Sequence, residues 1–140
     1  MKKLIVFLFP FISFAQIDNV KLQQDFVKEL NVYRASKGLK PVSLNSNEIS
    51  TAKLQANYCS SIGTLTHDYP GGRVNVYHEC ALFNAELPDA KLYINQWISS
   101  PGHNAQLLKD DITHIGIYYV KGFHNKAGFA GYYAVLVLNP

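Results

Sequence analysis

The run "FAGYYAVLVLN" at residues 129–139 limits the possible folds more than any other part of the chain. Side chains of a strand alternate between two faces, and here both alternating sets are apolar or aromatic. A strand that is apolar on both faces is covered on both faces. The run therefore predicts a sheet with helices packed against each side, which is a three-layer α/β/α sandwich.

Two long helices are predicted before this sheet. Apolar residues recur at helical spacing over 19–37, and a glycine ends the pattern. A second helix is predicted to begin near Asn45, where Asn45 and Glu48 match a capping box, and to stop by Gly63.

Shorter elements are predicted in the second half of the chain. A third helix fits 88–99, and the stretch "SSPGHNAQLL" (99–108) begins a fourth, with Ser100 as its N-cap. Residues 112–120 predict another strand. The segment 66–83 is loop-like at first, and its last residues fit either a short strand or a turn of helix.

The N-terminus has the pattern of a secretory signal peptide. Two lysines precede the apolar run 4–12, and the small residues Ser13 and Ala15 follow it. The run is too short to cross a bilayer. We therefore expect a signal peptide over 1–15, a single domain over 16–140 with no membrane span, and a secreted or extracellular location, with retention in a periplasm as the alternative.

The charge of the chain does not favour nucleic acid as a partner. The formal net charge of +3 falls to +1 when the two lysines of the signal segment are removed. A nearly neutral surface lacks the basic patch that attracts phosphate backbones. We expect no nucleic-acid partner.

The two cysteines of the chain, Cys59 and Cys80, have two interpretations. An even number of cysteines in an exported chain predicts a disulfide, which would stabilise the fold by about 3 kcal/mol. The alternative is a catalytic thiol at Cys80. Neither cysteine has a second one at short metal-ligand spacing, so a zinc site built on both thiols is not predicted.

Three polar residues are candidates for a functional site: His67, Glu79 and His103. Two imidazoles and a carboxylate are ligands typical of zinc, and a position in the first turn of a helix favours the neutral imidazole that a metal needs. Spacing alone does not show that the three converge. An H-E-x-x-H motif is excluded because Leu82 occupies the second histidine position, and Ser100 lacks the G-x-S-x-G motif of a serine hydrolase.

Several segments, taken in order, resemble the CAP superfamily, also called the SCP domain, in its short bacterial form. This family contains the cysteine-rich secretory proteins, antigen 5 and the pathogenesis-related proteins. The stretch from Trp97 to Leu108 is the most specific part of the resemblance, which extends over nearly all of 16–140. The segments are "LNVYRASKGLKPVSLN" (30–45), "LTHD" (65–68), "YHECALF" (77–83), "QWISSPGHNAQLL" (96–108) and "HIGIYYV" (114–120).

The resemblance implies an α/β/α sandwich of CAP type with a cleft lined by two histidines and two glutamates. Residue by residue, the first histidine of this tetrad falls on His67, one glutamate on Glu79 and the second histidine on His103. A disulfide between Cys59 and Cys80 would tie the second helix to the neighbour of Glu79.

The chain departs from the family pattern at two places. The second glutamate of the tetrad falls on Ser100, and the Gly-Glu-Asn motif of the family is changed to His78, Glu79 and Cys80. Whether another carboxylate, such as Asp68, replaces the missing glutamate in space is left open by the sequence.

Three functions are consistent with these residues. The first is an extracellular binding module that holds a divalent ion, such as zinc, through His67 and His103, with Glu79 as a ligand or an orienting partner. The second is a metal-assisted hydrolase or peptidase, for which Glu79 is the candidate catalytic residue. The third is a lipid or sterol binder, a role associated with some family members. The candidate partners are extracellular peptides, glycans or lipids, and whether the protein is an enzyme is left open.

Overall fold

The computed structural model describes residues 18–140, so the predicted signal peptide lies outside the described residues. Within residues 18–140, no helix is long and apolar enough to cross a membrane. The elements in chain order are α1 (Asn19–Ser36), β1 (Ser43–Leu44), α2 (Ser46–Ile62), β2 (His78–Asn84), α3 (Ala90–Ile98), α4 (Pro101–Leu107), β3 (His114–His124) and β4 (Phe129–Asn139).

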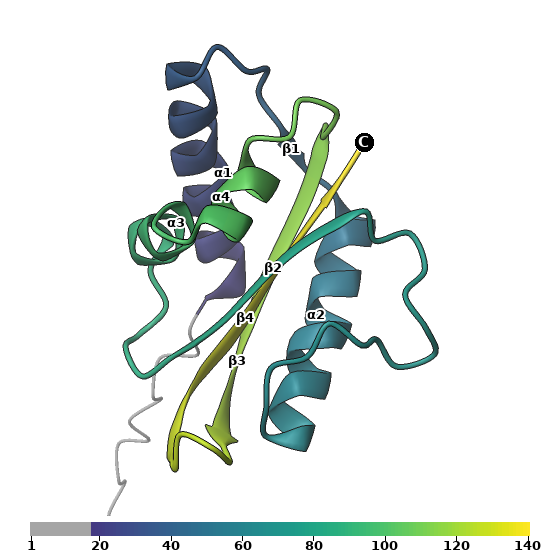
Figure 1. The fold of residues 1–140 in the computed structure, drawn as a ribbon, viewed down its shortest axis with the longest axis vertical. Coiled ribbons are helices and arrows are strands. Elements are labelled where there is room, and N and C mark those ends of the chain that lie inside the picture. Colours follow the sequence, from purple (N-terminus) through teal and green to yellow (C-terminus); the bar gives the residue numbers. More distant parts are fainter. Residues whose placement is uncertain (1–17) are drawn as a thin grey trace, which may run out of the picture.

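The strands form one sheet in the order β1-β3-β4-β2 (Figure 1). β4 is antiparallel to both of its neighbours, β3 and β2, whereas the short β1 is parallel to β3. Residues 131–139 of β4 are all buried. This confirms the prediction that the run 129–139 is a strand covered on both faces.

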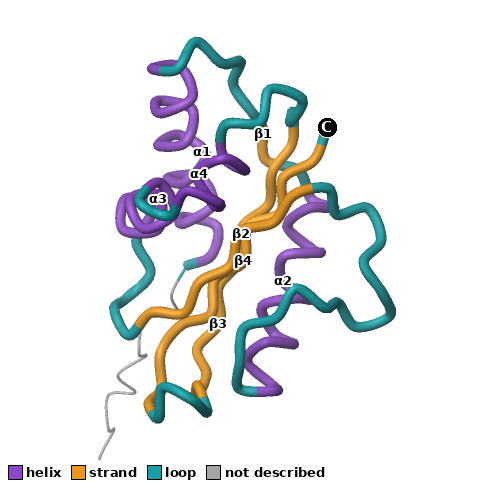
Figure 2. Tube along the Cα trace, viewed as in Figure 1, coloured by secondary structure: helices purple, strands orange, loops and turns teal. Residues whose placement is uncertain are grey.

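Helices cover both faces of the sheet and complete a three-layer α/β/α sandwich. α1, α3 and α4 lie on one face, and α2 lies on the other (Figures 1 and 2). The first face is packed with large side chains, among them Phe26 and Trp97, whose rings meet edge to face with centroids 5.6 Å apart. The predicted fold class is therefore confirmed.

The opposite face is packed with small side chains. Ala52 and Ala56 of α2 contact a cluster that includes Val135 and Val137 of β4. The backbone of α2 also approaches β3 closely, because a Cβ atom at Gly116 would overlap the backbone of Glu48. Only glycine allows this approach of helix to strand.

The start of α2 differs from the predicted capping box. The Asn45 side chain accepts a hydrogen bond from the backbone N–H of Asn47, so Asn45 is the N-cap as expected. Glu48 does not bond back to Asn45: its Oε1 accepts a hydrogen bond from Asn139 Nδ2 at 3.0 Å. Glu48 thus links α2 to the end of β4, a contact that local sequence could not reveal.

Three further features differ from the sequence-based prediction or were left open by it: the start of α3, the type of element that ends segment 66–83, and the presence of β1. α3 begins at Ala90 and not at residue 88, because Asp89 is its N-cap and accepts from the N–H of Leu92. The open alternative at the end of segment 66–83 is a strand, β2. The two-residue β1 was not predicted, since its pairing with β3 forms only in the folded chain.

The structure does not contain the predicted disulfide, because Cys59 and Cys80 are both free. Cys80 belongs to the core beneath α1, α3 and α4, whereas Cys59 lies on α2, across the sheet. Successive residues of a strand point to opposite faces, and Cys80 points away from α2. The predicted disulfide between Cys59 and Cys80 is therefore wrong.

Neither thiol has the environment of a catalytic cysteine. Burial, with a smaller contribution from the negative charge of Glu79, raises the pKa of Cys80. Burial also raises the pKa of Cys59. Both side chains are protonated at neutral pH, so the structure disfavours the alternative of a nucleophilic thiolate at Cys80.

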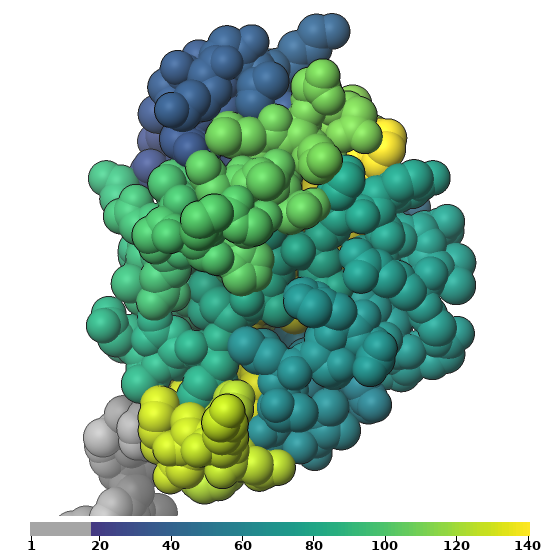
Figure 3. Space-filling view, viewed as in Figure 1, coloured from purple at the N-terminus to yellow at the C-terminus, as the bar shows by residue number. Residues whose placement is uncertain are grey.

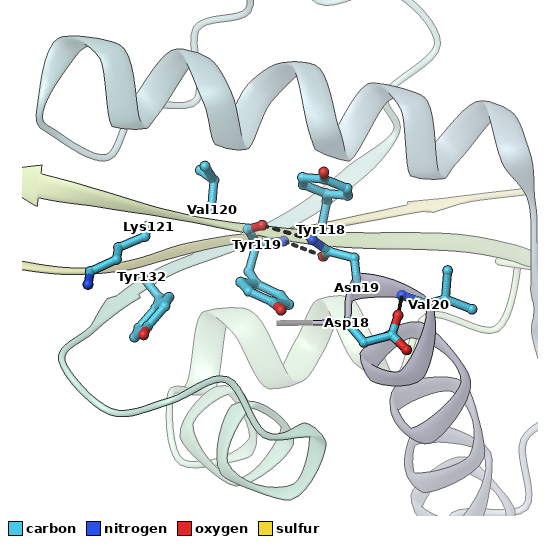
Figure 4. Close-up of a pocket in the computed structure, with 8 residues that line it drawn as sticks. All are labelled: Asp18, Asn19, Val20, Tyr118, Tyr119, Val120, Lys121 and Tyr132. Atoms are coloured by element: carbon cyan, nitrogen blue, oxygen red, sulfur yellow. Dashed lines mark hydrogen bonds between the residues drawn. The ribbon is translucent and has the colours of Figure 1, made fainter. Parts of the chain in front are cut away.

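Side-chain amides of α1 cover the part of the β3 edge that β1 leaves open. Asn19 Oδ1 accepts from the N–H of Tyr119 at 3.0 Å, and Asn19 Nδ2 donates to the carbonyl of Tyr119 at 3.2 Å (Figure 4). Gln23 Nε2 donates to the carbonyl of Ile117. A cavity of about 600 Å³ lies beside this contact, and none of the candidate site residues lines it.

Candidate functional site

The candidate residues gather around β2, which is an edge strand of the sheet. His67 lies in the loop between α2 and β2, Glu79 is the second residue of β2, and His103 lies in α4. In the space-filling view, α4 (green) and the chain before β2 (teal) meet along one face of the molecule (Figure 3). The two histidines therefore approach β2 from different layers of the sandwich.

Glu79 is the buried member of this group. Its side chain is 1% exposed, and its Oε1 lies 3.3 Å from Nδ1 of His67, whose side chain is 61% exposed. Neither carboxylate oxygen accepts a hydrogen bond from the described residues. A buried carboxylate without such donors is stabilised by a nearby positive charge, so Glu79 favours a cation at this point.

Tyr69 lies close to the same carboxylate. Burial raises the pKa of Tyr69, and the negative charge of Glu79 raises it further. The Tyr69 hydroxyl is therefore protonated at neutral pH, and it has no hydrogen-bond partner among the described residues. The carboxylate of Glu79 thus has the imidazole of His67 and the phenol of Tyr69 as neighbours. No motif or spacing in the sequence singles out this tyrosine.

The imidazole of His103 contacts Ser100, the residue at the position of the second glutamate of the family's tetrad. Ser100 occupies the N-cap position of α4, as predicted, but its side chain makes no capping hydrogen bond. Ser100 Oγ lies instead 2.9 Å from Nδ1 of His103. The interpretation of Ser100 as a simple helix cap is therefore incomplete, because its hydroxyl orients the imidazole.

The environment of His103 favours the neutral imidazole. Burial lowers the pKa of His103, and the proximity of His67 lowers it further. A positive charge near His103 disfavours the protonated form of its imidazole. The sequence-based expectation that His103 is neutral in its helix is consistent with this direction, although burial is the main cause.

A cavity of about 270 Å³ opens beside Glu79, and four of its lining residues were not recognised as site residues from the sequence. His78 is one of the four, and its Nε2 lies 3.7 Å from Asp111 Oδ1. His103 does not line the cavity. The lining residues are His67, Arg73, Tyr77, His78, Glu79 and Gln106.

Asp68 does not replace the missing glutamate. Its side chain is exposed and accepts a hydrogen bond from Thr66 Oγ1 at 3.3 Å, within the turn that precedes the cavity. Asp68 is not among the residues that line the cavity. Ser100 is therefore the residue that makes the contact with His103 at the fourth tetrad position.

The arrangement brings two imidazoles and one buried carboxylate to the same strand, without a closed ligand set. Within residues 18–140, no group of three or more His, Cys, Asp or Glu side chains is close enough to hold a metal ion. Coordination by His67, Glu79 and His103 together stays a prediction. What the geometry does provide is an oxygen near Nδ1 of each imidazole: Glu79 Oε1 lies 3.3 Å from that of His67, and Ser100 Oγ lies 2.9 Å from that of His103.

Comparison with protein families agrees with the fold. The model of the CAP family, described as the cysteine-rich secretory protein family, matches residues 27–138. The chain therefore belongs to the CAP family, which confirms the resemblance seen in the sequence. No curated protein sequence matches the chain at a significant level.

Solved structures with the same fold include bacterial proteins of this family. An outer surface protein of Borrelia burgdorferi superposes with a TM-score of 0.66 at 19% identity, covering 88% of this chain and 96% of that one. An extracellular SCP-domain protein of Bacillus anthracis gives 0.62 at 17% identity, covering 86% of this chain and 41% of that one.

A cysteine-rich secretory protein of Staphylococcus aureus gives a TM-score of 0.64 at 21% identity, covering 88% of this chain and 40% of that one. This chain therefore spans less than half the length of the Bacillus and Staphylococcus proteins. At such identities, the likeness establishes the fold and not a shared ligand.

Proposed function

We propose that this CAP protein is an exported binding module that holds a divalent cation, zinc or copper, between the imidazoles of His67 and His103. One observation carries the proposal: Nδ1 of each ring faces an orienting group, Glu79 for one and Ser100 for the other. Imidazoles that bind metals commonly engage their second nitrogen in this way. Nε2 of each ring is then the nitrogen available to the cation.

In this proposal, Glu79 orients His67 and supplies negative charge, and it is not itself the principal ligand. Its buried carboxylate lies on the Nδ1 side of the ring and lacks hydrogen-bond donors among the described residues. A carboxylate in this position makes an imidazole a stronger ligand. A bound cation would in turn compensate the buried charge of Glu79.

The lowered pKa of His103 supports the same proposal. A metal binds the neutral form of imidazole. Because His103 is already neutral at neutral pH, no proton has to be removed from it before the metal binds. Protons compete with the metal for the imidazole of His103 as the pH falls. The proposal therefore includes weaker metal binding at acidic pH.

A cation held by two imidazoles keeps open coordination positions, at which it would polarise a bound water or a ligand atom. Arg73 and Gln106 line the neighbouring cavity and offer hydrogen-bond donors to such a ligand. This arrangement suits a module that captures an extracellular ligand. Export itself is supported by the sequence pattern of residues 1–15.

The test is calorimetric titration of Zn²⁺ into the chain comprising residues 16–140 at neutral pH. We expect one zinc per chain with micromolar or tighter affinity, and loss of binding in both His67→Ala and His103→Ala. Glu79→Gln should weaken binding by about 10- to 100-fold, because it removes the charge of an orienting partner. His114→Ala is the matched control, because His114 contacts Thr113 and does not line the cavity.

Two results would contradict the proposal. One is the absence of zinc and copper binding to the folded protein at neutral pH. The other is binding that survives in both His67→Ala and His103→Ala, since the metal would then lie elsewhere. Circular dichroism of each variant verifies that the fold is kept.

A further inference from the structure

The contact between His67 and Glu79 joins an exposed side chain to a buried one. The Glu79 side chain is 1% exposed and belongs to β2, so the sheet fixes its position. The His67 side chain is 61% exposed, so packing around the ring restricts it little. The distance of 3.3 Å between Glu79 Oε1 and His67 Nδ1 therefore depends on how the backbone of His67 is held.

The chain reaches His67 by turning back at the end of α2. Gly63 ends this helix with a φ of 69°, in the left-handed region, and the N–H of Thr64 donates to the carbonyl of Cys59 at 3.2 Å. In Figure 1 the chain then runs beside α2 before it turns toward β2. The segment around His67 thus lies within reach of side chains from α2.

A buried amide of α2 bonds to the backbone on both sides of His67. Gln55 Nε2 donates to the carbonyl of Thr66 at 2.7 Å and to the carbonyl of Asp68 at 3.0 Å. The nitrogen of a glutamine amide carries two N–H groups, so these two contacts use its full donor capacity. One side chain therefore holds the carbonyls of both residues that flank His67.

Other contacts of this turn are either local or weaker. The N–H of Asp68 donates to Thr66 Oγ1 at 3.0 Å, which shapes the turn but does not attach it to a helix. The Cys59 thiol, a weak donor, lies 3.7 Å from the carbonyl of Thr66. Gln55 therefore supplies the stronger attachment of the turn to α2.

Gln55 differs from the other buried residues of α2. The others are Ala52, Ala56 and Cys59, all of which are small. Gln55 is 0% exposed, and its Oε1 has no hydrogen-bond partner among the described residues. A buried amide with an unpaired oxygen costs free energy that an apolar side chain would avoid. The two donors of Gln55 therefore explain its presence better than a gain in stability does.

We propose that Gln55 is a positioning residue for His67. Its amide holds the turn at residues 66–68 so that Nδ1 of the imidazole meets Glu79 and Nε2 is presented to a cation. The first effect concerns the metal-free protein, whereas the effect on cation binding rests on the proposed function. Loss of the amide leaves Glu79 in place and releases His67, which weakens binding in the way that loss of an orienting partner does.

The test compares Gln55→Met with Gln23→Met in the chain comprising residues 16–140. Gln23 is the matched control, because it is a buried glutamine of α1 whose Nε2 donates to the carbonyl of Ile117 at 3.0 Å. It does not line the cavity of the candidate site. Each variant loses a buried amide that bonds to the backbone, so both should lower the Tm.

Long-range ¹H–¹⁵N spectra of the metal-free protein measure the first effect. In Gln55→Met, we expect the ring nitrogens of His67 to shift toward their values in the unfolded chain. In Gln23→Met, they should stay as in the wild type. The ring nitrogens of His103 should change little in either variant. Unchanged ring nitrogens of His67 in Gln55→Met would overturn the inference.

Calorimetric titration of Zn²⁺ measures the effect on binding. We expect about tenfold weaker binding in Gln55→Met and wild-type affinity in Gln23→Met. Equal weakening by the two substitutions would also overturn the inference, since lost stability would then explain it. If the wild type binds no zinc, the proposed metal site fails, while the metal-free spectra still decide whether Gln55 positions His67. If Gln55→Met does not fold, Gln55→Asn takes its place with the same expectations, because its amide is one methylene shorter and cannot reach both carbonyls.

Discussion

The two faces of the central sheet are packed in different ways. The face beneath α1, α3 and α4 carries an extensive core of large side chains, including Trp97 and Phe26. The face beneath α2 has a small cluster of alanines and valines, and there helix and strand approach through backbone contact at Gly116. The comparison indicates that the first face supplies most of the hydrophobic stabilisation, while the second depends on close fit.

The candidate site lies where these two layers meet, at β2. Glu79 points to the same side as Ala81, which packs in the cluster beneath α2, and Cys80 points into the opposite core. His67 follows α2 and His103 lies in α4, so the two imidazoles come from opposite layers. A change that shifts one layer relative to the other should therefore alter the site as well as the stability.

The largest effect is expected from truncation in the face of large side chains. Trp97 is buried against Phe26, and Trp97→Ala should lower the free energy of unfolding by about 3–5 kcal/mol through lost burial and a cavity. Urea denaturation followed by circular dichroism measures the change. A loss below about 1 kcal/mol would mean that this face is not the main source of stability.

The next effect tests the close fit of the opposite face. Gly116→Ala places a methyl group against the backbone of Glu48 and should destabilise the protein by about 1–3 kcal/mol. Gly102→Ala is the matched control, because nothing lies within 4 Å of a Cβ there. The helical control should be neutral or slightly stabilising. Equal effects of the two substitutions would refute the role of backbone contact at α2.

A smaller effect is expected from the cysteines, which lie on different sides of the sheet. Cys59→Ala and Cys80→Ala should each cost about 1 kcal/mol and add independently, since the thiols are free. A reducing agent should leave the wild-type Tm unchanged. If the reductant instead removes about 3 kcal/mol of stability, the two cysteines form the disulfide that the structure lacks.

The smallest effect is the change of stability with pH that arises from His103. The pKa of His103 is lowered in the folded state from its ordinary value of 6.5, so the unfolded chain binds the proton more readily. The metal-free protein should lose stability as pH falls below about 6.5, and His103→Gln should reduce this dependence while His114→Gln does not. The same pH slope in His103→Gln and the wild type would remove His103 as its source.

The sequence alone was sufficient for those elements whose pattern is long and periodic. α1 and β4 were placed from their apolar spacing, with β4 matching its predicted range of 129–139. The layer arrangement followed from β4, because its two apolar faces require two covering layers. β1 and the Glu48–Asn139 contact were missed, since both depend on partners distant in sequence.

The candidate site was only partly predictable. His67, Glu79 and His103 were candidates because of their residue types, but only the family resemblance predicted that they share one site, since their separation along the chain gives no sign of contact. Arg73 and Tyr77 belong to a loop without periodicity, so nothing in the sequence placed them at the cavity. The disulfide was wrongly expected because the count of cysteines does not reveal which face of β2 Cys80 occupies.

The most direct test of the account is whether His67 and His103 bind the same cation. Long-range ¹H–¹⁵N spectra of the histidine side chains, recorded during zinc titration, report each ring nitrogen of the five histidines separately. The account predicts that Nε2 of His67 and of His103 shift together and saturate at one equivalent, while His78, His114 and His124 do not respond. A response from only one of the two rings, from neither, or chiefly from the other three would contradict it.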